Sequence, residues 1–147
     1  MTLLVQVIVR LLFVPILLLS LTLLIKGYSR PGDGFAAGVV ASLAVLLQHV
    51  AFGRAVVERE IPLRAALWMV WAGLLISLAV VFYPLLSGGA PVTHFPPPGA
   101  EVAKWGSIEL HTSLLFDVGV YLLVFGFTVG VLDEIAQRAD RGGERED

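Results

Sequence analysis

The amino-acid sequence predicts an all-α, polytopic membrane protein of four transmembrane helices, with a long Pro-rich outer loop. Three observations predict this fold class. Of the 147 residues, 57% are apolar and only 15% are charged, whereas soluble domains carry about 25% charged residues. The charges cluster between apolar runs and near the end of the chain. Each apolar run approaches the ~20 residues that a helix needs to cross the hydrocarbon layer.

The four predicted spans are placed by the apolar runs and by the residues that end them. We expect helices at about residues 3–26, 34–53, 62–86 and 108–133, in one membrane domain over residues 1–147. The first run is longer than the roughly 7–15 apolar residues of a signal peptide, so we expect a retained helix. Gly53 stands where a helix C-terminal glycine belongs, and Pro62 stands at a helix start, where proline is tolerated.

Two segments lie outside the predicted spans. The outer loop at residues 87–107 contains Pro96, Pro97 and Pro98, and such a run favours an extended polyproline II segment. Residues 134–147 are charged and contain glycine. We therefore expect them to form a solvated, partly disordered tail.

Lysine and arginine predict the orientation of the chain. With four spans, the two termini and the 54–64 loop share one side. That side carries six basic residues: Arg54, Arg59, Arg64, Arg138, Arg141 and Arg145. The other side carries Lys26, Arg30 and Lys104, and Arg10 can snorkel toward the first side. The positive-inside rule therefore predicts a multi-pass protein of the cell membrane with both termini in the cytoplasm.

Composition argues against several other classes of function. The net charge of −2 gives no reason to expect nucleic acid as a partner. Cysteine is absent, and the sequence has no phosphate-binding loop, HExxH motif or nucleophile elbow. We therefore expect no cofactor and no metal.

Asp117 is the most informative polar residue, because it lies inside the fourth predicted span. An ionised carboxylate at the centre of a span costs about 2.5–3.5 kcal/mol, so such residues face other helices or a wet cavity. Ser113, Tyr121 and Thr128 fall on the same helical stripe. This stripe is a candidate ion path. The alternative is that Asp117 fixes the packing through a hydrogen bond to a neighbouring subunit.

The second predicted span carries small residues on one face. Gly34, Gly38 and Ser42 are four residues apart, a spacing that lets another helix approach closely. His49 falls on the same side, too far in depth from Asp117 for a direct pair. The preceding string, Pro31-Gly32-Asp33-Gly34-Phe35, predicts a tight turn that serves docking or loop locking. Asp33 is placed to cap the helix.

Three polar residues are further candidates: His49, Glu109 and His111. The spacing Glu-x-His could supply two metal ligands, but no third ligand accompanies them. Glu109 also suits the N-terminal end of a helix dipole. The pattern therefore assigns no metal.

Two strings of the sequence resemble a known family. One is Pro31-Gly32-Asp33-Gly34-Phe35-Ala36-Ala37-Gly38, followed by an apolar helix that ends in Ala51-Phe52-Gly53. The other is Thr112-Ser113-Leu114-Leu115-Phe116-Asp117-Val118-Gly119-Val120-Tyr121. Together with the length and the four-span plan, they are similar to the MnhB/MrpB-type subunit of the multisubunit Mrp sodium/proton antiporter. Two residues depart from the family pattern: Tyr28 replaces a frequent His, and Asp33 replaces a glycine.

This resemblance implies a small accessory subunit of a monovalent cation (Na+)/proton antiporter. Its partners would be the other Mrp subunits and the lipid bilayer, and the complex would transport Na+ and H+. The chain would contribute to assembly and, in one interpretation, to an ion path. The same domain type occurs in membrane-bound hydrogenases and formate-linked ion-pumping complexes, which is the alternative. A stand-alone channel or membrane enzyme is a third hypothesis, and the small-residue packing face argues against it.

Overall fold

The computed structural model describes residues 3–26, 32–60, 65–86, 104–105, 108–109 and 112–143. In these ranges, four helices are long and apolar enough to cross a membrane. They are α1 (Leu3–Lys26), α2 (Asp33–Phe52), α4 (Ala65–Leu86) and α5 (Thr112–Gly143). The prediction of a helical protein with four spans is confirmed. A short helix α3 (Arg54–Glu60) and an antiparallel pair of strands, β1 (Lys104–Trp105) and β2 (Ile108–Glu109), were not predicted.

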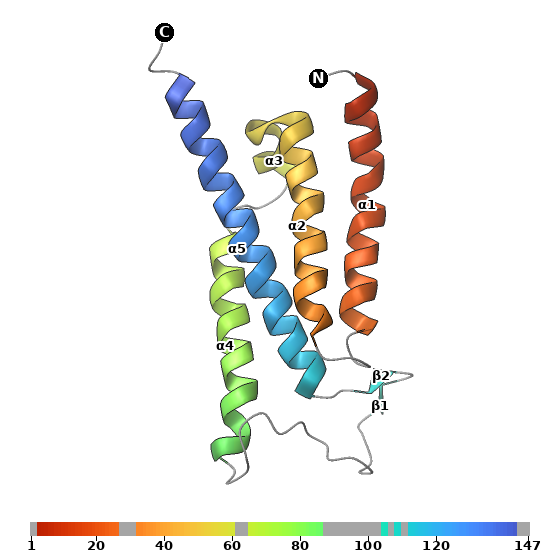
Figure 1. Cartoon of the computed structure of the whole chain (residues 1–147), viewed down its shortest axis with the longest axis vertical. Helices are drawn as coiled ribbons and strands as arrows, with labels where there is room; N and C mark the ends of the chain where they lie inside the picture. The colour runs from red at the N-terminus through yellow and green to blue at the C-terminus, as the bar shows by residue number, and fades with distance from the viewer. Residues whose placement is uncertain are drawn as a thin grey trace.

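The four long helices lie side by side in an open row, in the order α1, α2, α5, α4 (Figure 1). α2 packs against both α1 and α5, whereas α4 packs only against α5 among the described helices. Over an 18-residue apolar stretch of each helix, 44% is therefore buried in α2 but only 11% in each of α1 and α4. Because the row does not close into a bundle, wide apolar faces remain exposed.

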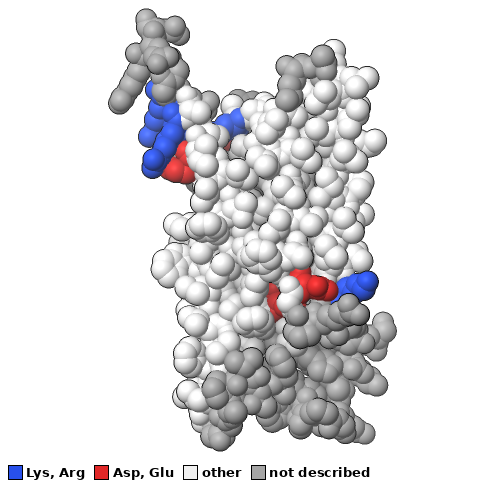
Figure 2. Space-filling view, viewed as in Figure 1, with Lys and Arg blue, Asp and Glu red and all other residues white. Residues whose placement is uncertain are grey.

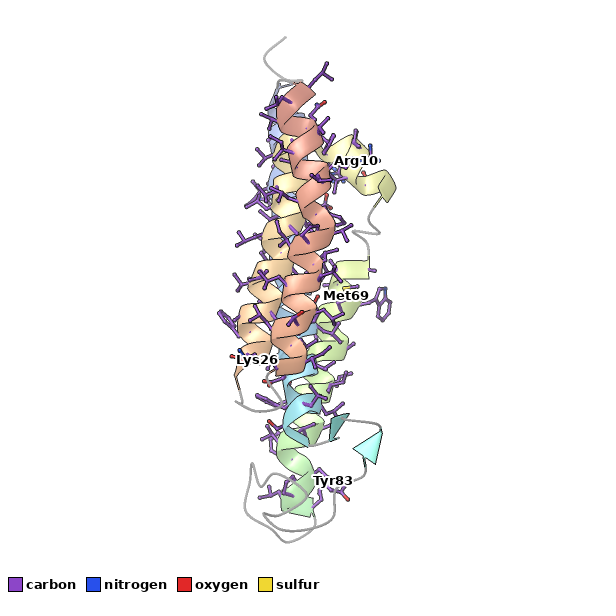
Figure 3. The ribbon with its side chains drawn as sticks, turned by 90° about the vertical axis from the view of Figure 1, so that its right-hand side faces the viewer. Arg10, Lys26, Met69 and Tyr83 are labelled. Atoms are coloured by element: carbon purple, nitrogen blue, oxygen red, sulfur yellow. The ribbon has the colours of Figure 1, made fainter. Side chains whose placement is uncertain are left out.

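Charged side chains lie near the two ends of the row along the helix axes, toward the top and the bottom of the view in Figure 1. Figure 2 shows a broad uncharged band between an upper and a lower group of charges. Figure 3 places Arg10 toward the end of α1 where α3 lies, and Lys26 and Tyr83 toward the opposite end. The 24 residues of α1 extend about 36 Å, which exceeds the ~30 Å of a hydrocarbon layer. The first residues of α1 and the last of α5 share one end (Figure 1).

The core lies near the end of the row that carries α3. Val45 of α2, Val57 of α3, Ala66 of α4 and Val129 of α5 form one buried cluster. Phe13 and Phe125 pack against it. The four helices that follow α1 are brought together in this cluster.

The fourth span differs from its predicted range of 108–133. α5 begins at Thr112, because residues 108–109 form β2, and it continues to Gly143. The first part of the predicted disordered tail is therefore helical. An ion pair between Arg138 and Glu134, one turn apart at 2.9 Å, supports the extension. Apolar runs mark where a helix leaves the membrane, which is not where the helix ends.

The prediction of a loop over residues 54–64 is also wrong in its first half, which is helical. The left-handed backbone of Gly53 (φ 79°) ends α2, and its N–H donates to the His49 carbonyl at 2.9 Å. The chain then re-enters a helix as α3, because Val57 buries its side chain in the core while Arg54 and Glu58 form an ion pair. The role predicted for Gly53 as a helix terminator is confirmed.

Several predicted features lie outside the described residues. They are Pro31, the start of the third span at residues 62–64, most of the Pro-rich loop at residues 87–103 and 106–107, and the end of the tail at residues 144–147.

Candidate functional site

Asp117 is the centre of the candidate site. It lies on the face of α5 that packs against α2, and its side chain is only 1% exposed. The backbone N–H of Gly32 donates to Asp117 Oδ1 at 3.2 Å. A carboxylate suits this place because the first N–H groups of a helix have no intrahelical acceptor and carry partial positive charge.

The turn that presents this N–H depends on Gly32. Gly32 is the residue before α2, and its φ of 112° is a left-handed conformation that side chains other than glycine rarely adopt. Asp33 does not cap the helix as predicted: it is the first residue of α2, and the N-cap residue is Gly32, which has no side chain of its own to cap the helix. The cap is instead completed from another helix, by Asp117.

Two glycines of α2 allow α5 to approach this closely. A Cβ on Gly34 would overlap the backbone carbonyl oxygen of Asp117 and lie 2.8 Å from its Cα. A Cβ on Gly38 would lie 3.0 Å from Val124 Cβ and 3.1 Å from the Tyr121 carbonyl oxygen. The predicted small-residue face of α2 therefore packs against the predicted polar stripe of α5, within one chain.

The other members of the two predicted groups take less specialised places. Ser42 is buried and donates to the Gly38 carbonyl of its own helix at 2.7 Å, while Phe35 is largely exposed. Ser113, Tyr121 and Thr128 are half-buried on α5. The Tyr121 ring stacks on Phe125 with centroids 6.1 Å apart.

His49 lies at a different depth from Asp117, as predicted. Its Nδ1 is 3.2 Å from the Val45 carbonyl oxygen, and its Nε2 has no hydrogen-bond partner among the described residues. Between the levels of His49 and Asp117, α2 and α5 pack through Val45 and Val129, which are 1% and 2% exposed. This part of the interface between α2 and α5 is therefore apolar and tightly packed.

Glu109 and His111 were the remaining polar candidates of the sequence. Glu109 lies in β2, opposite Lys104, and its side chain lies outside what the structure describes, as does His111. Across the described ranges, no group of three or more His, Asp or Glu side chains could hold a metal ion.

The close contact between α4 and α5 was not predicted from the sequence. A Cβ on Gly73 would lie 2.5 Å from the Gly119 carbonyl oxygen, and one on Gly126 would lie 2.5 Å from the Ala66 carbonyl oxygen. The two helices touch backbone to backbone at both levels. The signal was present in Gly119 and Gly126, seven residues apart on the fourth span.

The hydrogen bonds between α1 and α2 were also not predicted. Ser20 Oγ donates to the Ala37 carbonyl at 2.8 Å, and Gln48 Nε2 to the Val9 carbonyl at 3.0 Å. Gln6 Nε2 donates to the Ala51 carbonyl at 3.3 Å. Isolated polar residues in the first two spans were the available signal, because a polar side chain in an apolar span needs a partner.

An ion pair joins the first residue of α3, directly after α2, to α5 on the side of the termini. Arg54 Nε lies 2.8 Å from Asp133 Oδ1, and Arg54 also reaches Glu58 at 3.5 Å. Both Arg54 and Asp133 are partly buried, at 19% and 26% exposure. Polar contacts thus hold α5 at two levels, through Asp117 to the start of α2 and through Asp133 to the start of α3.

The chain matches one family description over residues 4–130, namely "Domain related to MnhB subunit of Na+/H+ antiporter". The B subunit of the Na(+)/H(+) antiporter of Alkalihalophilus pseudofirmus is 33% identical over 122 residues, which are 83% of each chain. The B subunit of the Na(+)/H(+) antiporter of Bacillus subtilis is 30% identical over 122 residues, 83% of this chain and 84% of the relative.

Two further matches are to much longer chains. The probable K(+)/H(+) antiporter A/B subunit of Rhizobium meliloti is 33% identical over 141 residues, which cover 92% of this chain and 13% of the relative. A chain of the solved Mrp complex from Dietzia sp. DQ12-45-1b superposes with a TM-score of 0.69 and 26% identity. This match covers 90% of our chain and 14% of the Dietzia chain.

The family match spans the two strings that meet at Gly32 and Asp117, and it extends over most of the described helices. The resemblance predicted from these strings is confirmed. The chain belongs to the family of domains related to the MnhB subunit of Na+/H+ antiporters, which are components of transport complexes and not enzymes.

Proposed function

We propose that this chain is an accessory membrane subunit of a multisubunit antiporter that exchanges a monovalent cation for protons. The observation that carries the proposal is the match to a B-type antiporter subunit over 83% of both chains. The relatives are named for Na+ and for K+. Sodium is our first choice of cation, because the family description and the two relatives of similar length carry that name.

We infer that the partners include an A-type subunit. In the Rhizobium relative, a region similar to nearly the whole of this chain belongs to one polypeptide that carries the combined name A/B. A domain that is covalently joined to another in one relative and separate in others is well placed to contact that other domain in a complex. The exposed apolar faces of the open row leave room for such contacts.

Within this complex, we assign Asp117 to assembly. Its carboxylate accepts a hydrogen bond from the Gly32 N–H of the same chain, and this bond links the start of α2 to α5. The alternative role in an ion path is weakened by the apolar contact of Val45 and Val129 farther along the same interface. The other members of the stripe then contribute only to the surface of α5; they are Ser113, Tyr121 and Thr128.

We further propose that the termini lie in the cytoplasm. The supporting observation is that Arg54, Arg138 and Arg141 lie toward the end of the row that holds the first residues of α1 and the last of α5. Excess positive charge marks the cytoplasmic side of a membrane protein.

Copurification tests this function. The tagged full chain is extracted in mild detergent from its native membrane, and its partners are identified by mass spectrometry. The expected result is a complex with other antiporter subunits, and loss of cation/proton exchange in vesicles when the gene is deleted. Recovery of nickel or iron–sulfur proteins would instead support a hydrogenase-type complex. Ion transport by the purified chain alone in liposomes would support a stand-alone channel.

A further inference from the structure

A groove between α4 and α5 is not used by the proposed function. It has a volume of about 500 Å³ and lies toward the end of the row that carries the termini. Its lining residues are Ala66, Leu67, Val70, Gly126, Phe127, Gly130, Val131 and Glu134. The lining is almost entirely apolar. Glu134 is the one charged residue at its mouth among the described lining residues.

The groove stays open because Gly130 has no side chain. A Cβ on Gly130 would meet only Ala66 Cβ, at an ordinary contact distance of 3.9 Å. At Gly126 the helices close, since a Cβ there would lie 2.5 Å from the Ala66 carbonyl oxygen and 3.0 Å from Met69 Cβ. The groove therefore begins at Gly126 and opens toward Glu134, over about 12 Å of α5.

Two arginines continue the same face of α5 beyond the groove. Phe127, Val131, Glu134, Arg138 and Arg141 follow one another at intervals of four and three residues, so they share one helical face. Arg138 is 77% exposed and uses its Nε to bind Glu134, which neutralises the acid at the mouth. Arg141 is exposed and makes no ion pair with the described residues. Figure 2 shows basic residues at this upper end, above an uncharged surface.

We propose that this groove binds an anionic phospholipid, with one acyl chain between α4 and α5 and the phosphate near Arg138 and Arg141. Basic pockets between spanning helices on the cytoplasmic side are suited to anionic headgroups. The volume falls within the range of about 300–1,000 Å³ that is common for small-molecule sites. The inference goes beyond the proposed antiporter role and rests on the proposed function only for the cytoplasmic side of this end of the helices.

A spanning helix of another subunit fits this groove less well. Such a helix packs along much of the ~30 Å hydrocarbon layer, whereas the groove ends after about 12 Å of α5. Its lining also contains Leu67, Phe127 and Val131, while contacts between spanning helices favour small residues. An acyl chain fits a short groove with large apolar side chains, and the positive charge of Arg138 and Arg141 beyond the groove matches an anionic headgroup.

Fluorescence quenching by brominated lipids tests the proposal. The reporter is Leu67→Trp in the full chain, with Trp68, Trp71 and Trp105 replaced by Phe. The protein is reconstituted in phosphatidylcholine vesicles that contain increasing fractions of brominated phosphatidylglycerol, and then of brominated phosphatidylcholine. We expect phosphatidylglycerol to associate more tightly. Arg141→Gln should lower this preference about fivefold, as expected for ~1 kcal/mol per basic residue, and Arg141→Lys should retain it.

A second pair of variants tests the groove itself. Gly130→Leu should reduce quenching by both lipids, because its side chain fills the groove without meeting backbone. Ala72→Leu, at an exposed site on α4, and Lys26→Gln, at the opposite end of the row, should change neither quenching nor preference. Equal affinity for the two lipids would overturn an anionic site, and insensitivity to Gly130→Leu would overturn the groove. Quenching that disappears in the assembled complex would show that a protein covers it, and would also overturn the proposal.

Discussion

The backbone N–H of Gly32 donates to the carboxylate of Asp117 at 3.2 Å, across 85 positions of sequence. This hydrogen bond joins the two strings by which the chain resembles its family. One string supplies a glycine turn with an available N–H at the start of α2, and the other supplies a buried acceptor on α5. The relationship explains why a carboxylate stands in an otherwise apolar span.

Replacing Asp117 should affect assembly before it affects transport. Asp117→Ala removes the hydrogen bond that the Gly32 N–H donates to a charged acceptor, and such a bond contributes about 1.5–3 kcal/mol. Asp117→Asn keeps an oxygen acceptor but loses the charge, so we expect a smaller loss of assembled complex. Copurification yield and antiport per assembled complex are the measurements. Asp33→Asn, the same chemical change at the half-buried start of α2, is the control. Loss of antiport in a fully assembled Asp117→Asn complex would favour an ion path instead.

Gly34→Ala should be strongly destabilising, because the added methyl group overlaps the Asp117 carbonyl oxygen. Overpacking of this kind costs about 1–3 kcal/mol. Thermal unfolding of the full chain in detergent measures the effect. Ala36→Val adds bulk at an exposed position nearby and should leave the midpoint unchanged. A tolerated Gly34→Ala would mean that α2 and α5 are less closely packed than described.

Gly126→Ala should weaken the contact of α4 with α5, whereas Gly130→Ala should not. The first methyl group would lie 2.5 Å from the Ala66 carbonyl oxygen, and the second 3.9 Å from Ala66 Cβ. The same substitution one turn apart therefore separates close backbone packing from helix propensity. The expected difference in unfolding free energy is about 1–3 kcal/mol. Equal midpoints for the two variants would contradict the described contact.

Arg54 and Asp133 should be energetically coupled. Arg54→Gln and Asp133→Asn each break the 2.8 Å ion pair, and the double variant should lose less than the sum of the single losses. We expect a coupling of about 1 kcal/mol, near the upper end for exposed pairs, because both groups are partly buried. A double-mutant cycle on thermal unfolding gives this value. Additive losses would show that the pair contributes nothing measurable.

The orientation can be read by cysteine labelling, because the natural chain contains no cysteine. Arg141→Cys should react with a membrane-impermeant maleimide only in inside-out vesicles. Lys26→Cys, at the other end of the row, should react only in intact cells. The reverse pattern would invert the proposed topology.

The sequence determined the membrane class, the four spans and the two strings at the candidate site. These features follow from local properties: the length of apolar runs, the position of glycines and the rarity of an acid in a span. It did not predict the helical extension of α5 to Gly143 or the helix α3. Both depend on contacts, because ion pairs and the burial of Val57 stabilise helix in segments too polar to be recognised as spans.

Only the tertiary structure decided which faces meet. The sequence marked Gly34 and Asp117 separately, and for Asp117 it offered an ion path or a hydrogen bond to a neighbouring subunit. The fold instead placed the two residues against each other within one chain. It also gave α4 a close contact through Gly73 and Gly126, and left the row open on both sides. The physical reason is that a periodic pattern fixes which residues share one face of a helix, whereas the neighbour of that face depends on backbone approach distances between segments far apart in the chain.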